Sequence, residues 1–349
     1  MTTFLKKSLL LSVVLFGASL ADSSQLEACT RAVYLGPNNT VITGRSMDWK
    51  EDIKSNIYVF PRAMDRKGMQ TGNTLSWTSK YGSIIATAYD IGSSDGMNEK
   101  GLVANMLYLS ESTYTRENDS RPMLSIGAWA QYILDNFATV SEAVAELRKD
   151  NFQIHSVIAP NGAASTVHVS ISDPTGNSAI FEYFNGNIVI HEGREFQVMT
   201  NSPKYDEQLA LNQYWKQLGG TVMLPGTNRA ADRFARASFY INATQQTDKE
   251  QESVASVFSV IRNCSVPLGI STPGEPNISS TVWRTVSDHK NMTYYFESTL
   301  SPTVFWFKLS KLDFKKGAPV KKLELTNGQI YSGEATAMLK NSVPFKFAE

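Results

Sequence analysis

The stretch that decides the fold is EACTRAVYLGPNNTVITGRSMDW, residues 27–49. It holds Cys29, one of only two cysteines in the chain, and it begins shortly after an apolar N-terminal run. Segments 31–36 and 40–47 are rich in β-branched and aromatic residues, and they flank the turn-forming sequence PNN. This pattern predicts a β-hairpin with a lone cysteine at its start.

The register of the hairpin predicts which side chains surround the cysteine. If Gly36 pairs with Val41, Cys29 pairs with Asp48, and directly opposite residues share a face of the sheet. Arg45 is an odd number of residues from Asp48, so strict alternation puts it on the other face. We therefore expect a bulge at the preceding glycine to bring Arg45 to the thiol, where its charge would favour the thiolate.

The N-terminus predicts export. Two lysines precede the apolar run 8–20, and the Ser-Leu-Ala sequence ending at Ala21 has the form of a signal-peptidase site. The run is too short to span a bilayer comfortably. We expect a signal peptide at 1–21, a periplasmic or secreted protein, and no stable membrane span. The 349 residues carry a formal net charge of zero, which argues against nucleic-acid binding and against a polybasic membrane patch.

The rest of the chain predicts blocks of strands and helices. Strand-like segments occur at 55–62, 82–90, 101–109, 165–172, 179–193, 196–201, 281–289, 292–298, 303–310 and 321–326. Helical spacing of apolar residues predicts helices at about 124–148, 204–218, 229–243 and 248–262. The blocks lack strict strand–helix alternation, so they favour antiparallel sheets covered by helices over a parallel Rossmann-type sheet. No linker divides the chain, so one domain is expected.

Three uses of Cys29 other than catalysis by its own amine stay open on the residues alone. It could pair with Cys264 in a disulfide, as exported proteins often do. Residues 26–29 have the outline of a lipid-attachment motif, although polar residues separate them from the apolar run, and such a chain would be an exported binding lipoprotein. It could also act with one of four histidines as a Cys–His hydrolase, although none of the four lies in a catalytic signature.

A fourth hypothesis makes Cys29 an N-terminal nucleophile. If residues 22–28 were removed, Cys29 would begin a mature domain of residues 29–349 and would carry a free α-amino group. An α-amine has a pKa of about 7.7 to 8.0, so it is a usable general base near neutral pH. It lies within reach of its own thiol, and no histidine is then required.

Several segments together resemble the choloylglycine hydrolase and penicillin V acylase family, closer to its Gram-negative branch. These are N-terminal-nucleophile hydrolases of linear amide C–N bonds. The segments follow the family's order at similar spacing: CTR (29–31), GRSMDW (44–49), SDGMNEKGL (94–102), TNSP (200–203), LPG (224–226) and DRF (232–234). The resemblance implies a four-layer αββα sandwich, in which two antiparallel sheets are covered by helices.

The resemblance also implies the roles of the site residues. Cys29 is the nucleophile and its amine the base, with Arg45 and Asp48 beside it. Asn201 donates its side-chain amide to the oxyanion, and the backbone N–H of Tyr108 is the second donor. Arg233 is the remaining site arginine, although Arg236 lies in the same local sequence.

The substrate class also follows from the resemblance. Trp49 and Tyr108 resemble the aromatic pocket of the exported Gram-negative branch, some members of which also cleave N-acyl homoserine lactones. Aromatic walls suit a phenoxyacetyl or fatty acyl group, and a conjugated bile salt is the alternative. No cofactor and no metal are expected. A homo-oligomer, a tetramer or a dimer, is implied, although the stretch between Asn201 and Arg233 is shorter than the one that carries an assembly loop in Gram-positive bile salt hydrolases.

Overall fold

A computed structural model describes residues 28–349 of the chain, apart from 163, 272–278 and 302. The expected signal peptide and almost all of the expected pro-segment, residues 1–27, lie outside the described residues. Among the described residues, no helix has the length and apolar character needed to cross a bilayer.

The first large sheet carries the quoted hairpin. Its neighbouring strands are antiparallel except for the last pair, which is parallel. Within the described residues its order is β14 (Val198–Met199), β1 (Thr30–Leu35), β2 (Val41–Trp49), β15 (Ser280–Asp288), β16 (Thr293–Ser298), β17 (Val304–Lys308) and β19 (Gly333–Glu334). The segment that follows β14 therefore lies beside the start of β1.

The second large sheet is antiparallel throughout its described strands. Its order is β13 (Asn187–Glu192), β12 (Ser178–Phe184), β11 (Val167–Ser172), β8 (Val103–Tyr108), β7 (Gly92–Asn98), β6 (Ser83–Ala88), β3 (Ile57–Phe60), β18 (Lys321–Leu323) and β20 (Lys340–Asn341). Two small pairs join β9 (Met123–Ser125) to β10 (Gln153–His155) and β4 (Asp65–Lys67) to β5 (Ser76–Thr78).

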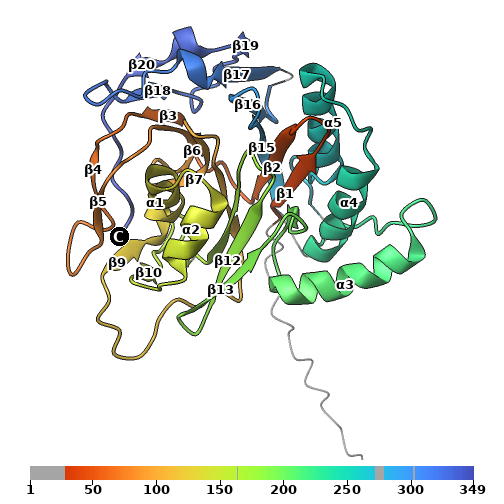
Figure 1. The fold of residues 1–349 in the computed structure, drawn as a ribbon, viewed down its shortest axis with the longest axis horizontal. Coiled ribbons are helices and arrows are strands. Elements are labelled where there is room, and N and C mark those ends of the chain that lie inside the picture. Colours follow the sequence, from red (N-terminus) through yellow and green to blue (C-terminus); the bar gives the residue numbers. More distant parts are fainter. Residues whose placement is uncertain (1–27, 163, 272–278, 302) are drawn as a thin grey trace, which may run out of the picture.

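Helices cover the outer face of each sheet (Figure 1). The second sheet packs against α1 (Trp129–Asn136) and α2 (Val140–Leu147), and the first against α4 (Ala230–Ala243) and α5 (Glu250–Asn263), with α3 (Tyr205–Leu218) beside α4. Short 3-10 turns lie at Ile126–Ala128, Leu309–Lys311 and Thr336–Met338. The predicted αββα sandwich is confirmed.

The single long helix expected at 124–148 is wrong, because the chain breaks between α1 and α2. The buried Asn98 side chain donates to the carbonyl oxygens of Leu134 and Phe137, which end α1. Thr139 then caps α2 by accepting a hydrogen bond from the Glu142 N–H. The sequence TVSE carries this start signal, and the apolar spacing on both sides hides it.

Two apolar clusters form the core. One fills the space between the sheets and continues under α4 and α5, and the other lies between the second sheet and α1 and α2. Strand β3 shows the alternation that divides them: Ile57 and Val59 face the first cluster, and Tyr58 and Phe60 the second. Both faces of each sheet are therefore buried over much of their area.

The hairpin register differs by one residue from the prediction. Leu35 pairs with Val41 and Thr30 with Ser46, and the register is unbroken between them. The loop is tighter than expected because the Gly36 N–H donates to Thr40, while two consecutive asparagines take left-handed backbone angles. A shift of one residue moves every side chain of β2 to the opposite face. Continued to Cys29, this register places Met47 opposite the cysteine, not Asp48.

Gly44 serves helix packing rather than the expected bulge. A Cβ atom there would lie 2.6 Å from Val257 and 2.7 Å from Ile261 on α5. We expect Gly44→Ala to lower the free energy of unfolding by about 1–3 kcal/mol, because helix and strand must separate to make room. Urea unfolding measures the change, and Gly226→Ala is the matched control, since nothing lies within 4 Å of its Cβ position. Equal stability of the two variants would contradict the packing argument.

Buried His289 makes the fold sensitive to acid. Its ring contacts the Thr43 hydroxyl at 2.8 Å and the Gly101 carbonyl oxygen at 2.6 Å, and burial lowers its pKa to about 4. The unfolded chain takes up this proton near pH 6.5. The contribution of neutral His289 to the free energy of unfolding is therefore complete above pH 6.5. It is lost as pH falls towards 4, by up to about 3 kcal/mol. Urea unfolding of wild type and His289→Asn between pH 7.5 and 4 should show the steeper decline in wild type; parallel curves would refute it.

Candidate active site

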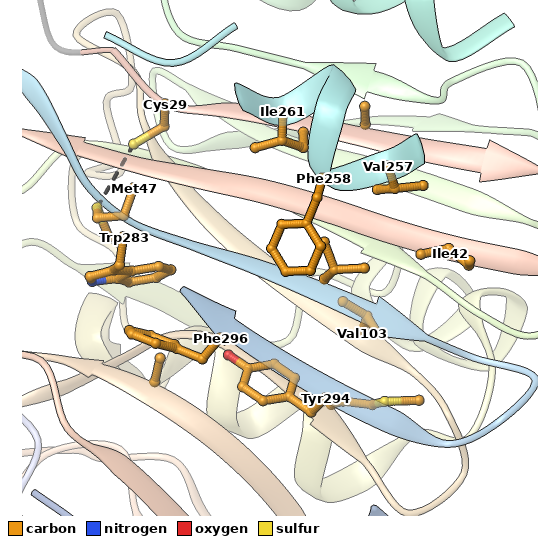
Figure 2. Packing of buried hydrophobic residues seen from close by; sticks show 14 of the residues in the cluster. Cys29, Ile42, Met47, Val103, Val257, Phe258, Ile261, Trp283, Tyr294 and Phe296 are labelled. Carbon is orange, nitrogen blue, oxygen red and sulfur yellow. Dashed lines mark hydrogen bonds between the residues drawn. The ribbon is translucent and has the colours of Figure 1, made fainter. Parts of the chain in front are cut away.

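Cys29 lies at the meeting point of three strands. It directly precedes β1, which is flanked by β2 and β14. The pairing of Arg31 with Met199 places Asn201 opposite Cys29 when the register is continued. The thiol is buried, and its sulfur accepts a hydrogen bond from the Asp48 backbone N–H at 3.4 Å. Figure 2 shows Met47 between this thiol and Trp283, with the two sulfur atoms 3.9 Å apart.

Arg45 reaches the thiol without a bulge. The observed register pairs it with Arg31, two residues after Cys29, so it shares the face of the thiol. Its Nη2 lies 3.9 Å from the cysteine sulfur and donates to the Met106 carbonyl oxygen at 2.9 Å. Arg45 therefore lies beside the thiol as expected, but the bulge expected at Gly44 is wrong.

The Arg45 guanidinium is fully buried and is held by two further groups. Its Nη1 lies 3.8 Å from the Asp95 carboxylate, and its carbon lies 4.5 Å over the ring of Trp283. Asp95 in turn accepts hydrogen bonds from Asn105 at 2.6 Å and from Tyr294 at 2.6 Å. A fixed positive charge therefore stands beside the sulfur, with its counter-ion on the far side.

Burial and charge act on the thiol in opposite directions. Burial raises the pKa of the Cys29 thiol, and the positive charge of Arg45 is the largest opposing effect. The Asp48 carboxylate raises this pKa further, and Arg233 lowers it. Burial also raises the pKa of Asp48 to about 6. Thiolate formation at this site therefore depends on the two arginines.

Asn201 connects the cysteine to the second sheet. Its Oδ1 accepts from the Cys29 backbone nitrogen at 2.7 Å, and its Nδ2 donates to the Tyr108 carbonyl oxygen at 2.8 Å. The Leu109 N–H donates to the carbonyl oxygen of Thr166, the residue before β11, and successive N–H groups of a strand point to opposite sides. The Tyr108 N–H therefore points to the side of the strand on which Asn201 lies. Two candidate oxyanion donors thus meet beside the thiol.

Arg233, not Arg236, is the arginine at the site. From α4 it donates to the Cys29 carbonyl oxygen, to the Thr30 hydroxyl at 2.7 Å and to Asn201 Oδ1 at 2.8 Å. Arg236 instead donates to carbonyl groups in the loop before α4. Burial lowers the pKa of the Arg233 guanidinium.

The Asp48 carboxylate lies on the helix-facing side of β2, away from the thiol. It accepts hydrogen bonds from Thr281 and, at 3.4 Å, from Ser46. The Cys29 nitrogen, here an amide nitrogen joined to Ala28, donates to Asn201 instead. Asp48 therefore contacts the sulfur through its backbone N–H. The prediction that its side chain shares the face of Cys29 is wrong.

An apolar pocket extends from the thiol. It measures about 820 Å³ with its open mouth, and Cys29, Arg45, Trp49 and Tyr108 all line it. The two aromatic rings meet edge to face, with centroids 6.3 Å apart, and Trp49 donates to the Tyr89 hydroxyl at 2.9 Å. Aliphatic side chains complete the wall, among them Ile53, Ile91, Ile126, Val157 and Val167. Such a pocket takes an aromatic or aliphatic group beside the nucleophile.

Sequence reasoning missed several neighbours of the site. Asp95 stands in the SDGMNEKGL motif but received no role. Trp283 and Thr281 lie in a strand-like segment with no site signal, and β15 brings them to β2 through a register shift between these two residues. The motif was the one available signal, and it pointed to Asp95 alone.

The other uses of Cys29 do not fit the structure. Both cysteines are buried and free, so the alternative of a disulfide between them does not fit. The Cys29 side chain is buried. The ring nitrogens of the buried histidines, His168 and His289, contact other groups. No described group of His, Cys, Asp and Glu side chains is arranged to hold a metal ion.

The fold and the site define a class. A buried thiol lies directly before the first residue of a strand inside an αββα sandwich, with amide and guanidinium donors around it and an apolar pocket in front. This arrangement suits nucleophilic attack on an acyl carbon, with stabilisation of the oxyanion by Asn201 and a backbone N–H.

The chain belongs to the linear amide C–N hydrolases of the choloylglycine hydrolase family, whose model matches residues 29–322, beginning at Cys29. It is 48% identical to a penicillin V acylase of Pectobacterium atrosepticum, over 98% of this chain and 97% of the relative. A bile salt hydrolase/transferase of Clostridium perfringens is 27% identical over 76% of this chain and 84% of that protein. The solved penicillin V acylase of Agrobacterium tumefaciens is 59% identical, with a TM-score of 0.85 over 91% of this chain and 99% of that one.

Family membership makes the protein an enzyme, a hydrolase of linear amide C–N bonds, and not a binding protein. The family resemblance seen in the sequence is confirmed.

Proposed function

We propose that this protein is an exported cysteine amidase that cleaves acyl amides with an aromatic or fatty acyl group, such as penicillin V or an N-acyl homoserine lactone. The observation that carries the proposal is the Cys29 thiol at the wall of an apolar pocket lined by Trp49 and Tyr108. Relatives at 48% and 59% identity are named penicillin V acylases.

The nucleophile acts after residues 22–28 have been removed. The free α-amine of Cys29 then takes the thiol proton, and the sulfur attacks the acyl carbon. A C–S bond forms, and the oxyanion is stabilised by Asn201 Nδ2 and the Tyr108 N–H. The C–N bond breaks as the α-ammonium group protonates the leaving amine.

A water molecule completes the reaction. It attacks the thioester, with the amine of Cys29 as general base. The C–S bond breaks, the carboxylic acid leaves, and the thiol is restored. Arg45 favours the thiolate in both halves of the cycle, since its charge lies 3.9 Å from the sulfur. Two further residues flank the new amine. Asp48 lies on the helix-facing side of β2, and Arg233 donates a hydrogen bond to the Cys29 carbonyl oxygen.

The intact mass of the purified mature protein, measured before and after incubation with penicillin V, tests this proposal. A chain that begins at Cys29, and release of phenoxyacetic acid, are the expected results. A chain that begins at Cys29 but leaves penicillin V and acyl homoserine lactones intact while cleaving conjugated bile salts would replace the proposed substrate class. An active chain that retains residues 22–28 would reject the N-terminal nucleophile.

A further inference from the structure

A buried histidine–glutamate pair lies in the second sheet, outside the thiol pocket. His168 on β11 and Glu182 on β12 are each 1% exposed, and their Nδ1 and Oε1 atoms lie 3.2 Å apart. The other ring nitrogen of His168 lies 2.7 Å from the Thr200 carbonyl oxygen. The proposed reaction uses neither side chain.

The partners define the direction of these hydrogen bonds. A carbonyl oxygen only accepts, so His168 Nε2 carries a proton and donates to Thr200. The Nδ1 atom then faces the Glu182 carboxyl group within hydrogen-bond distance. Glu182 also accepts from the Tyr205 N–H, at 3.1 Å and 3.2 Å, at the start of α3. The imidazole ring is therefore held at both ends, and its orientation is fixed.

The bond from His168 falls on the peptide group that precedes the oxyanion donor. The Thr200 carbonyl and the Asn201 nitrogen belong to one planar peptide group. A hydrogen bond to this carbonyl therefore fixes the orientation of the bond from the Asn201 nitrogen to its Cα atom. Gln208 donates to the next carbonyl, that of Asn201, at 3.1 Å. The backbone of Asn201 is thereby gripped on both sides, while its side chain contacts Cys29, Tyr108 and Arg233.

The contact also joins the two sheets at the site. His168 follows Val167, the residue that pairs with Tyr108 on β8, whereas Thr200 follows β14 of the first sheet. The two candidate oxyanion donors come from these two sheets, so their separation depends on what fastens one sheet to the other here. A misplacement of about 1 Å at such a site costs about 100-fold in rate.

We propose that His168, oriented by Glu182, is a positioning residue that holds the Thr200–Asn201 peptide so that the Asn201 amide and the Tyr108 N–H meet the same oxyanion. This inference rests on the proposed function, in which Asn201 is an oxyanion donor. His168 itself does not touch the substrate.

Two variants of one residue separate this role from a merely structural one. In His168→Gln the side-chain amide nitrogen reaches the place of Nε2 and keeps the bond to Thr200. In His168→Asn it takes the place of Nδ1 and keeps the bond to Glu182 instead. With penicillin V as substrate, we expect His168→Asn to lower kcat about 10- to 100-fold, with KM changed less than about threefold, and His168→Gln to keep kcat within about threefold. The reverse order, with both variants folded by circular dichroism, would overturn the proposal.

A double-mutant cycle tests whether the effect passes through Asn201. Removing an oxyanion donor costs about 100- to 1,000-fold in kcat, and we expect this from Asn201→Ala. The variant carrying both His168→Asn and Asn201→Ala should be no slower than Asn201→Ala alone. Multiplied losses would overturn the proposal. If His168→Asn does not fold, a folded His168→Gln with a loss near 100-fold would overturn it equally.

The same assays separate this inference from the proposed function. A wild-type protein that cleaves no acyl amide rejects the proposed function, and this inference with it. A wild-type protein that cleaves penicillin V while His168→Asn keeps the wild-type kcat rejects this inference alone.

Discussion

Cys29→Ala should abolish turnover of penicillin V, with kcat lowered at least about 1,000-fold. The reason is that Cys29 supplies the thiol that lines the pocket: the second cysteine, Cys264, contacts the Arg233 carbonyl oxygen at 3.8 Å and does not line the pocket. Release of phenoxyacetic acid measures the loss. Thermal unfolding should change little, since the substitution removes one sulfur atom from a site that opens into a pocket.

The matched control for this prediction is Cys264→Ala. Both sulfurs are buried and free, so the two substitutions remove the same atom from similar surroundings. Burial raises the pKa of Cys264 to about 11, which leaves it as a thiol at neutral pH. We expect this variant to keep its activity. Near-normal turnover in Cys29→Ala, or its loss in Cys264→Ala, would reject the assignment of the nucleophile. Cys29→Ser should retain little activity, because the alcohol is harder to ionise.

Arg45→Met should lower kcat/KM about 10- to 1,000-fold at neutral pH. An opposite charge within 4–6 Å moves the pKa of an acid by about 1–3 units. The substitution removes the largest effect that opposes burial at Cys29, and it leaves the Asp95 carboxylate uncompensated. The thiol pKa should therefore rise. The rate of iodoacetamide alkylation as a function of pH measures this directly, and its inflection should move to higher pH.

Breaking a buried ion pair also destabilises the fold, by about 3–5 kcal/mol, so a control must separate stability from chemistry. Arg66→Met is that control. Arg66 is also buried, lies 3.3 Å from the Asp135 carboxylate and 4.2 Å over the ring of Phe60, and does not line the thiol pocket. A comparable loss of stability with unchanged kcat/KM is expected. If the two variants lose activity alike, the effect of Arg45 is one of stability only.

The hairpin shows how far the sequence carries a fold prediction. Residue patterns predicted its two strands correctly, since β propensity and turn residues are local properties. Its register depends on whether the loop closes at Thr40 or at Val41, and on the left-handed angles of Asn38 and Asn39, which local patterns do not specify. The error of one residue exchanged the faces of Arg45 and Asp48.

Long-range neighbours of the thiol were found only where a motif pointed to them. Asn201 lies 172 positions from Cys29 and entered the prediction through family resemblance rather than periodicity. Trp283 has no such motif, and the irregular pairing of β15 with β2 brings it under Arg45. Three of the four predicted helices were close to the observed bounds. The fourth was missed because the break between α1 and α2 depends on Asn98, a residue of strand β7.

The glycine in β2 makes correct folding and catalytic assembly a single event. Gly44 faces α5, and the next side chain, Arg45, faces the other sheet. If β2 slipped by one position, the guanidinium would be forced between the apolar side chains of Val257 and Ile261. Such a chain would be unstable as well as inactive. The alignment of Arg45 with the thiol is therefore tied to the stability of the hairpin, because a shifted register would lose both together.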